Sequence, residues 1–177
     1  MTTFISLGEN CTPRIKLKHD YGLSKKGGYK SCPFDLCITP FESLCNILEN
    51  NFETFFGGLK IIEWEDAEGD RSLAGPGKTA ISNQDGIIFN HEGGGHSHLF
   101  RIGQNDDEFY SRDNFKEFKN KYSKRIENFK NKLESSDKIT FLYSDRYPQT
   151  PTFDLERIDK IIKDKYSCKN IEFIKVR

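Results

Sequence analysis

Several common signatures are missing from this chain of 177 residues, and each absence excludes a class of protein. No apolar run approaches the length of about 18 residues that a membrane-spanning helix needs, so no membrane span is expected. The N-terminal stretch MTTFISLG has no basic region, long apolar segment or small-residue cleavage site, so no secretory leader is expected. Lysine plus arginine and aspartate plus glutamate number 27 each, so the net charge predicts no nucleic-acid partner.

Disulfide and metal-site patterns are also lacking. The five cysteines form an odd set without a Cys-X-X-Cys pair, which is typical of reduced thiols and predicts a cytoplasmic protein. His91, His96 and His98, with Glu92 adjacent, have a spacing that invites a zinc interpretation. Three glycines among them leave no rigid helix to present the ligands, so we expect neither a metal nor another cofactor.

The pattern of apolar segments predicts one α/β domain over residues 1–177, built in three layers around a mostly parallel sheet. Strands and helices alternate at both ends of the chain, and residues 3–7, 138–143 and 170–175 are predicted to be neighbouring parallel strands. The middle is less regular. Two strand candidates there flank residues 65–80, a polar, glycine-rich segment predicted to be a surface excursion. The last strand ends at the C-terminus, so a fragment would lack a further C-terminal element.

Two helices have clear signals. A helix that starts near Arg112 has apolar residues at spacings of three and four, which places them on one face: Phe115, Phe118, Tyr122, Ile126, Phe129 and Leu133. We expect this face to be buried, and Lys119, Lys124 and Glu127 to be exposed. A second helix is predicted to begin with a capping box that has Thr39 at the N-cap and Glu42 at the third position.

Cys11 is the first candidate for chemistry. It stands behind a short apolar run and a Gly-Glu-Asn turn, at the start of a predicted helix with Pro13 in its first turn. The unpaired N–H groups and the positive dipole end of a helix favour a thiolate, so we expect the pKa of Cys11 to be lowered. The same N–H groups could form an oxyanion hole. The alternative is a small buried cysteine that packs beneath the sheet.

His91 and Asp35 are candidate partners for this thiol. His91 lies at the exit of a predicted strand, where it could act as a base towards a thiol from another strand end. The alternative is a surface histidine that caps a turn. Asp35 lies among apolar residues in CPFDLC, and a carboxylate in such surroundings is usually paired. It therefore either orients a histidine or holds a loop through backbone N–H groups.

With these residues in view, the chain resembles a bacterial family described as putative papain-like cysteine peptidases (domain of unknown function 1796). The resemblance depends on the order of several short motifs between residues 4 and 144: SLGENC, YGL, CPFD, ESLCNILENNFETFF, IIFNHE and the long helix with its following strand. It implies a Cys–His pair at Cys11 and His91. Leu36 stands where the family usually has tryptophan, and Glu92 where it often has aspartate.

A papain-like fold would be α+β, with its histidine in an antiparallel half, and this is the alternative to the three-layer fold. The leading hypothesis for function is a thiol-dependent acyl-transfer enzyme, either a hydrolase or a transferase. Cys11 attacks a carbonyl, His91 moves the proton, and Asp35 or Glu92 orients the imidazole ring. The Asn10 side chain and nearby N–H groups stabilise the oxyanion.

The substrate is expected to be a small molecule, a peptide or a glycan, contacted by Gly8, Glu9 and Glu92. Two further hypotheses compete with the enzyme. One is a non-catalytic binding domain for cell-envelope or surface-polysaccharide assembly, in which the same residues only hold loops. The other is recognition of a glycosyl or phosphate-sugar group at the strand ends of an α/β sheet, which follows from the location of the site alone.

Overall fold

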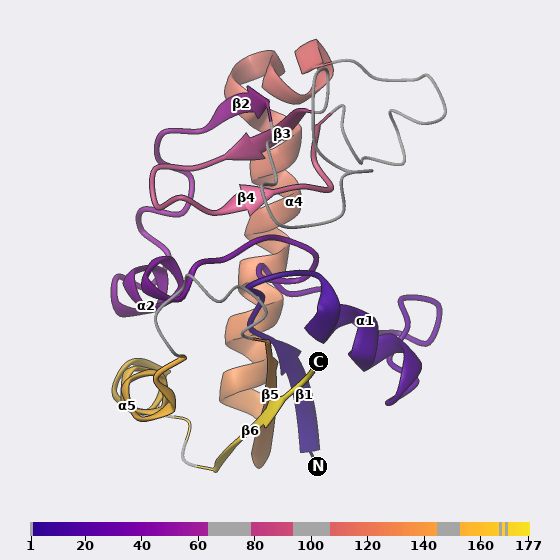
Figure 1. The fold of residues 1–177 in the computed structure, drawn as a ribbon, viewed down its shortest axis with the longest axis vertical. Helices are drawn as coiled ribbons and strands as arrows, with labels where there is room; N and C mark the ends of the chain where they lie inside the picture. Colours follow the sequence, from indigo (N-terminus) through magenta and orange to yellow (C-terminus); the bar gives the residue numbers. More distant parts are fainter. Residues whose placement is uncertain (1, 64–78, 94–106, 145–152, 167, 169) are drawn as a thin grey trace.

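The structure is a computed structural model of the chain, and it describes residues 2–63, 79–93, 107–144, 153–166, 168 and 170–177. Helices and strands are mixed, with one parallel and one antiparallel sheet (Figure 1). No helix in these ranges is long and apolar enough to cross a membrane. The fold is therefore a mixture of α and β elements in which the two sheets are separate.

The parallel sheet contains β1 (Thr2–Ser6), β5 (Lys138–Tyr143) and β6 (Ile171–Lys175), in the order β1-β5-β6. β5 lies in the middle and pairs in parallel with both neighbours. This confirms the predicted neighbourhood of the three strands. The prediction succeeded because each strand is a short apolar run followed or preceded by a clear helical pattern, which is the mark of parallel strands joined by crossovers.

The two faces of this sheet have different surroundings. Ile5, Ile139 and Phe141 are fully buried in the main hydrophobic core. Leu142 points to the opposite face of β5 from Ile139 and Phe141. It is also fully buried but lies outside that core. Helix α1 (Thr12–His19) contacts β1 and β5, and in Figure 1 it lies on the opposite side of the picture from α2 (Phe41–Glu49) and α5 (Leu155–Tyr166).

The antiparallel sheet contains β2 (Lys60–Glu63), β3 (Thr79–Ser82) and β4 (Ile88–Phe89), in the order β2-β3-β4. β3 begins inside the segment predicted to be a surface excursion, so that prediction is wrong at its C-terminal end. Ala80 and Ile81 of β3 are fully buried, because pairing with β2 on one side and β4 on the other places this strand in the centre of its sheet. The polar residues before it concealed the strand.

Helix α2 begins differently from the prediction. Pro40, in an extended conformation, is its N-cap residue, and no side chain caps the helix. The hydroxyl of Thr39 lies 3.1 Å from the sulfur of Cys37 instead. The predicted capping box is therefore wrong, because Thr39 is fully enclosed beside the preceding loop and its oxygen has a partner there.

Helix α4 (Asp107–Ser135) is the long helix, and its apolar face is buried as predicted. Its backbone leaves helical geometry from Arg112 to Phe115, so the regular helix begins after a kink that the apolar pattern did not reveal. Lys124 and Glu127 are exposed, whereas Lys119 is only half-exposed, contrary to the expectation. In Figure 1, α4 runs behind both sheets, and its aromatic side chains connect the core beneath each of them.

Candidate active site

The turn between β1 and α1 presents Cys11. Gly8 and Glu9 have left-handed backbone angles, with φ of 80° and 67°, so the chain reverses sharply after the strand. The side-chain oxygen of Asn10 then accepts a hydrogen bond of 2.8 Å from the N–H of Thr12. Cys11 follows as the N-cap residue of α1. The predicted place of this cysteine at the start of a helix is confirmed.

Close packing explains why glycine stands at position 8. A Cβ atom there would lie only 2.8 Å from the hydroxyl oxygen of Thr39, in addition to the cost of the left-handed backbone. The β1–α1 turn is thus fitted against the loop that leads into α2. Glu9 has the same backbone conformation without being glycine and is 3% exposed, which is uncommon and is often found near functional sites.

His91 meets this turn from the other sheet. It comes two residues after β4, and its Nε2 atom lies 3.4 Å from the sulfur of Cys11, although the two residues are 80 positions apart. Asn90 also points to the thiol, with its side-chain nitrogen 3.6 Å from the same sulfur. The predicted meeting of Cys11 and His91 is confirmed. Asn90 was not predicted, although its position immediately before a candidate base was a signal that could have found it.

The pKa of the Cys11 thiol is raised, which overturns the expectation of a lowered value. Burial is the larger influence, because it disfavours the charged thiolate, and the hydrogen bond from Asn90 opposes it. Burial therefore opposes formation of the thiolate in the free protein. A helix N-terminus favours the thiolate in general, but here α1 has only eight residues and the sulfur is partly shielded from water.

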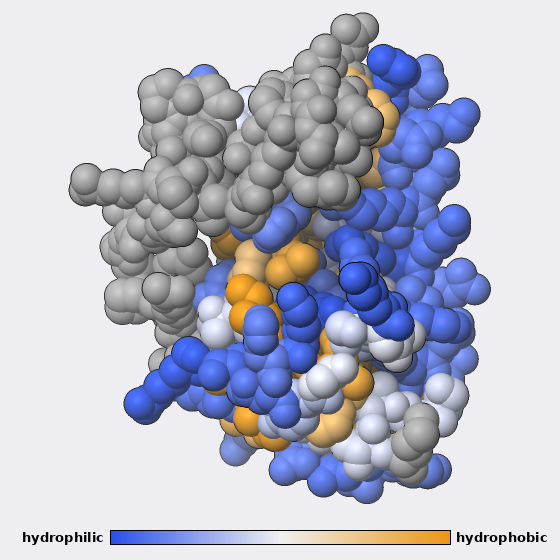
Figure 2. All heavy atoms as spheres, turned by 90° about the vertical axis from the view of Figure 1, so that its right-hand side faces the viewer, coloured by the Kyte–Doolittle hydropathy of each residue, from blue (hydrophilic) through white to orange (hydrophobic). Residues whose placement is uncertain are grey.

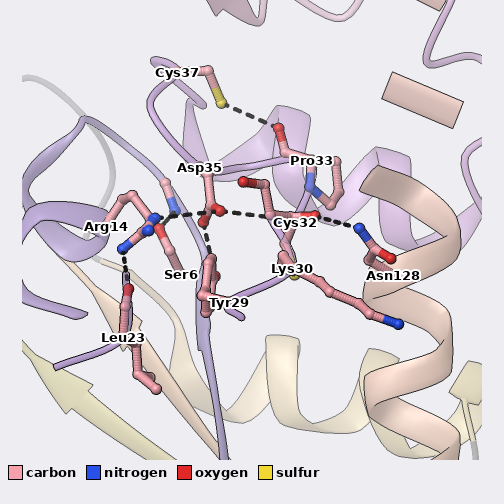
Figure 3. A network of polar contacts seen from close by, with 12 residues as sticks. Ser6, Arg14, Leu23, Tyr29, Lys30, Cys32, Pro33, Asp35, Cys37 and Asn128 are labelled. Carbon is pink, nitrogen blue, oxygen red and sulfur yellow. Dashed lines mark hydrogen bonds and ion pairs between the residues drawn. The ribbon is translucent and has the colours of Figure 1, made fainter. Parts of the chain in front are cut away.

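Asp35 holds a loop at the base of the site (Figure 3). Its carboxylate accepts hydrogen bonds from the N–H of Cys32 at 3.0 Å and from the hydroxyl of Tyr29 at 3.3 Å. It also forms an ion pair with Arg14 of α1, at 3.6 Å. Burial raises the pKa of Asp35, while the Cys32 N–H and the neighbouring cations oppose this shift. These contacts match the loop-holding interpretation.

The loop that Asp35 holds is attached to the His91 strand as well. Ile38, three residues after Asp35, forms a β-bridge with Ile88 of β4, with an N–O distance of 2.8 Å from its N–H to the Ile88 carbonyl. Glu92, directly after His91, is 5% exposed and its carboxylate forms an ion pair with Lys121 of α4. Both carboxylates that were predicted to orient the imidazole ring thus have cationic partners.

Some buried polar atoms around the thiol have no hydrogen-bond partner in the described part of the chain. They include the side-chain nitrogen of Asn10 and the side-chain oxygen of Asn90. An unpaired buried donor or acceptor is costly and is rare in a folded protein. The unpaired nitrogen of Asn10 lies in the residue directly before the candidate nucleophile.

The described residues contain no group of three or more side chains that could hold a metal ion. His96 and His98 of the possible zinc motif lie outside the described residues, so the expected absence of zinc stays a prediction. All five cysteines are free. The site contains a thiol, an imidazole and two carboxamides, which is a set of groups suited to covalent acyl chemistry.

Comparison with known proteins agrees with this assembly of groups. A family model described as putative papain-like cysteine peptidase (domain of unknown function 1796) matches residues 2–161. Comparison with curated proteins gave no match, and comparison with solved structures gave none either. The match extends from the first strand through most of α5, and so includes every residue described above at the thiol.

Proposed function

Because the chain belongs to the family of putative papain-like cysteine peptidases, we propose that it is a thiol-dependent acyl-transfer enzyme, a hydrolase or a transferase, with Cys11 as nucleophile. The observation that carries this proposal is the distance of 3.4 Å between the Cys11 sulfur and Nε2 of His91, which come from different sheets. Such a pair is the minimum that nucleophilic catalysis by a thiol requires.

The first half of the reaction forms an acyl-enzyme. His91 takes the proton from Cys11 as the sulfur attacks the substrate carbonyl, and the carbonyl electron pair moves onto its oxygen. The free side-chain N–H of Asn10 donates to that oxyanion. When the carbonyl reforms, the bond to the leaving group breaks and His91 gives its proton to that group. A thioester on Cys11 and a released alcohol, amine or thiol are the products.

The second half restores the thiol. His91 removes a proton from water, or from an acceptor alcohol or amine, which attacks the thioester carbonyl. The tetrahedral intermediate expels the Cys11 sulfur, and the sulfur regains its proton from His91. The raised pKa of Cys11 does not prevent this reaction, because the proton passes to His91 during the attack. The thiolate is needed only while the imidazolium formed from His91 lies beside it.

The remaining site residues act through position. Asp35 fixes the loop between α1 and β4, and Asn90 holds the sulfur of Cys11. Glu92 fixes the segment after His91 through Lys121. Gly8 and Glu9 shape the turn beside which the substrate binds. The protein is proposed to work in a reducing compartment such as the cytoplasm, and the free state of all five cysteines supports this.

A non-catalytic binding domain is the second candidate, and the raised pKa of Cys11 is the observation that favours it. Incubation with p-nitrophenyl acetate distinguishes the two, with peptide mass mapping of the acetylated residue. For the enzyme, we expect a burst of p-nitrophenol and an acetyl group on Cys11. His91→Ala should slow acetylation by about 10²–10⁴-fold, because the general base is lost.

Cys168→Ser is the matched control, because Cys168 is a free, buried cysteine from another part of the chain. This variant should keep the burst, whereas Cys11→Ser should lose it. Acetylation spread evenly over the cysteines, or a rate that His91→Ala leaves unchanged, would show that Cys11 and His91 form no catalytic pair.

A further inference from the structure

A pocket of about 640 Å³ is lined by Arg14, Ile15 and Lys18 of α1, the helix whose N-cap residue is Cys11. Arg14 and Ile15 lie three and four residues after Cys11, and Lys18 lies four and three residues after them, so these residues share one side of the helix. Figure 2 shows the side of the molecule on which α1 lies, where hydrophilic side chains surround smaller hydrophobic patches. The pocket and the thiol therefore occupy successive turns of the same helix face.

The lining of this pocket is strongly positive. Two arginines and three lysines contribute to it against the single carboxylate of Asp35, and the six are Arg14, Lys18, Lys25, Lys26, Arg125 and Asp35. The carboxylate is already engaged, because it forms an ion pair with Arg14 and accepts hydrogen bonds from the loop (Figure 3). The positive charge of the other four side chains is not balanced by an acid of the pocket.

Arg125 is the most informative member of this lining. It is 8% exposed, and its guanidinium lies over the ring of Tyr122, 4.5 Å from the centroid. Within the described ranges, its guanidinium forms no hydrogen bond or ion pair with an acceptor. Tyr122, Glu92 and Asp35 stabilise its positive charge and raise its pKa, but in the described residues none of them accepts a hydrogen bond from it. Its N–H groups can therefore donate to an oxyanion of a ligand.

The surroundings of Lys25 also favour a bound anion. Shielding from water lowers the pKa of Lys25, and the positive charges of Arg125, Lys121 and Arg14 lower it further. Like charges are thus crowded at this end of the pocket without enough acid to offset them. A bound anion would relieve the repulsion and would supply acceptors for Arg125 at the same time.

We propose that this pocket binds a multiply charged oxyanion, with phosphate chemistry as the best match, on the substrate whose acyl group Cys11 accepts. This inference rests on the proposed function. A single carboxylate would satisfy only one cation, whereas a phosphate or pyrophosphate can accept from Arg125 and from the lysines together. The acyl carbonyl would lie at Cys11, one helix turn from the anion.

Calorimetric titration of the full chain with pyrophosphate tests the pocket. We expect saturable binding that weakens at least ten-fold in Arg125→Gln and in Lys25→Gln. Lys25 is exposed, so its variant keeps the test valid even if Arg125→Gln fails to fold. Lys124→Gln is the matched control on α4, because Lys124 is exposed and does not line the pocket. No binding, or equal loss in Lys25→Gln and Lys124→Gln, would overturn the proposal.

Alkylation links the pocket to the thiol. The measured quantity is the rate at which the anion iodoacetate alkylates Cys11, divided by the rate for neutral iodoacetamide. Because the pocket is positive, this ratio should be higher in the native protein than in Lys25→Gln. Pyrophosphate should remove this preference. A rate ratio that neither Lys25→Gln nor pyrophosphate changes would overturn the link between pocket and thiol.

The two proposals fail separately. Cys11→Ser should still bind pyrophosphate, because the sulfur is not part of the anion site. If pyrophosphate binds but p-nitrophenyl acetate never acetylates Cys11, the pocket stands and the acyl-transfer function falls. If Cys11 is acetylated but pyrophosphate does not bind, the function stands and the anion pocket falls.

Discussion

The chemistry of Cys11 depends on two opposing effects that act on one atom. Burial keeps the sulfur protonated, and the carboxamide of Asn90 favours its ionised form, with burial the larger of the two. The thiol with a raised pKa is less ionised at a given pH than a free cysteine. Alkylation of Cys11 by a neutral reagent should therefore rise with pH, with a midpoint above the ordinary thiol value.

Replacing Asn90 with alanine should move that midpoint to still higher pH, because the hydrogen bond that opposes the effect of burial is removed. At pH 8 the rate of alkylation by iodoacetamide should fall several-fold. Mass spectrometry of the labelled peptide, measured from pH 6 to pH 11, gives the profile. Asn120→Ala is the control, since Asn120 is exposed on α4. A midpoint that moves to lower pH would mean that Asn90 does not stabilise the thiolate.

Much of the site at this scale could be predicted from the sequence, but not its electrostatics. Cys11 and His91 each follow a strand, and strand ends are where α/β folds place functional side chains. The direction of the Cys11 pKa was wrong because it depends on burial by distant segments, which no local motif encodes. Asn90 was overlooked because an asparagine beside a histidine has many ordinary uses.

At the scale of elements, α4 contacts both the hydrophobic core and the loop that supports the site. Phe129 of this helix packs against the rings of Phe34 and Phe52, with centroids 5.8 Å and 5.6 Å away. The preceding residue, Asn128, donates a hydrogen bond of 3.0 Å to the carbonyl of Ser31, in the loop that Asp35 holds. The same helix thus supports both the aromatic core and the loop below the thiol.

Phe129→Ala should lower the free energy of unfolding by about 3–5 kcal/mol, because the fully buried ring leaves a cavity among other aromatic side chains. Urea denaturation followed by circular dichroism measures the change. Lys124→Ala, on the exposed face of the same helix, should change stability by no more than about 0.5 kcal/mol. Similar losses in both variants would contradict the assignment of the buried face.

The helices were the most predictable elements and their ends the least. The apolar stripe of α4 identified its buried face, because spacings of three and four have one simple geometric meaning. The kink from Arg112 to Phe115 and the absence of a Thr39 cap on α2 depend on tertiary contacts. Lys119 is half-buried for a similar reason, since neighbouring segments cover more of the helix surface than the apolar stripe itself.

At the scale of the whole molecule, the Asp35 loop connects parts that are distant in sequence. Asp35 binds α1 through Arg14, and the residues that follow it pair with β4 through the bridge from Ile38 to Ile88. The turn that carries Cys11 and the strand that precedes His91 are therefore both fixed to this loop. Its integrity should control stability as well as the alignment of the pair.

Asp35→Ala should cost about 3–5 kcal/mol, because it leaves the buried guanidinium of Arg14 without its ion-pair partner and the Cys32 N–H without its acceptor. Thermal and urea denaturation measure the loss. The control is Asp159→Ala, which removes a surface pair with Lys163 and should cost no more than about 1 kcal/mol. The double variant Arg14→Met, Asp35→Leu should recover part of the lost stability. A cost in Asp35→Ala no greater than in Asp159→Ala would show that the loop does not depend on this carboxylate.

The architecture could be predicted in part. The parallel order of β1, β5 and β6 followed from the alternation of strands and helices. Of the antiparallel sheet, two strand candidates matched β2 and β4, while β3 was missed. Neither prediction specified how the two sheets meet. That relation depends on contacts such as Gly8 against Thr39, which are set by the shapes of side chains far apart in the sequence.

The placement of Cys11 after a parallel strand and of His91 after an antiparallel one has a consequence for the life of the protein. During synthesis the thiol emerges 80 residues before its base, and domains begin to fold from the N-terminal side. In the proposed mechanism, a nascent chain thus carries the nucleophile before the base that activates it has been made. Rapid acylation of Cys11 would then report that the two sheets have come together.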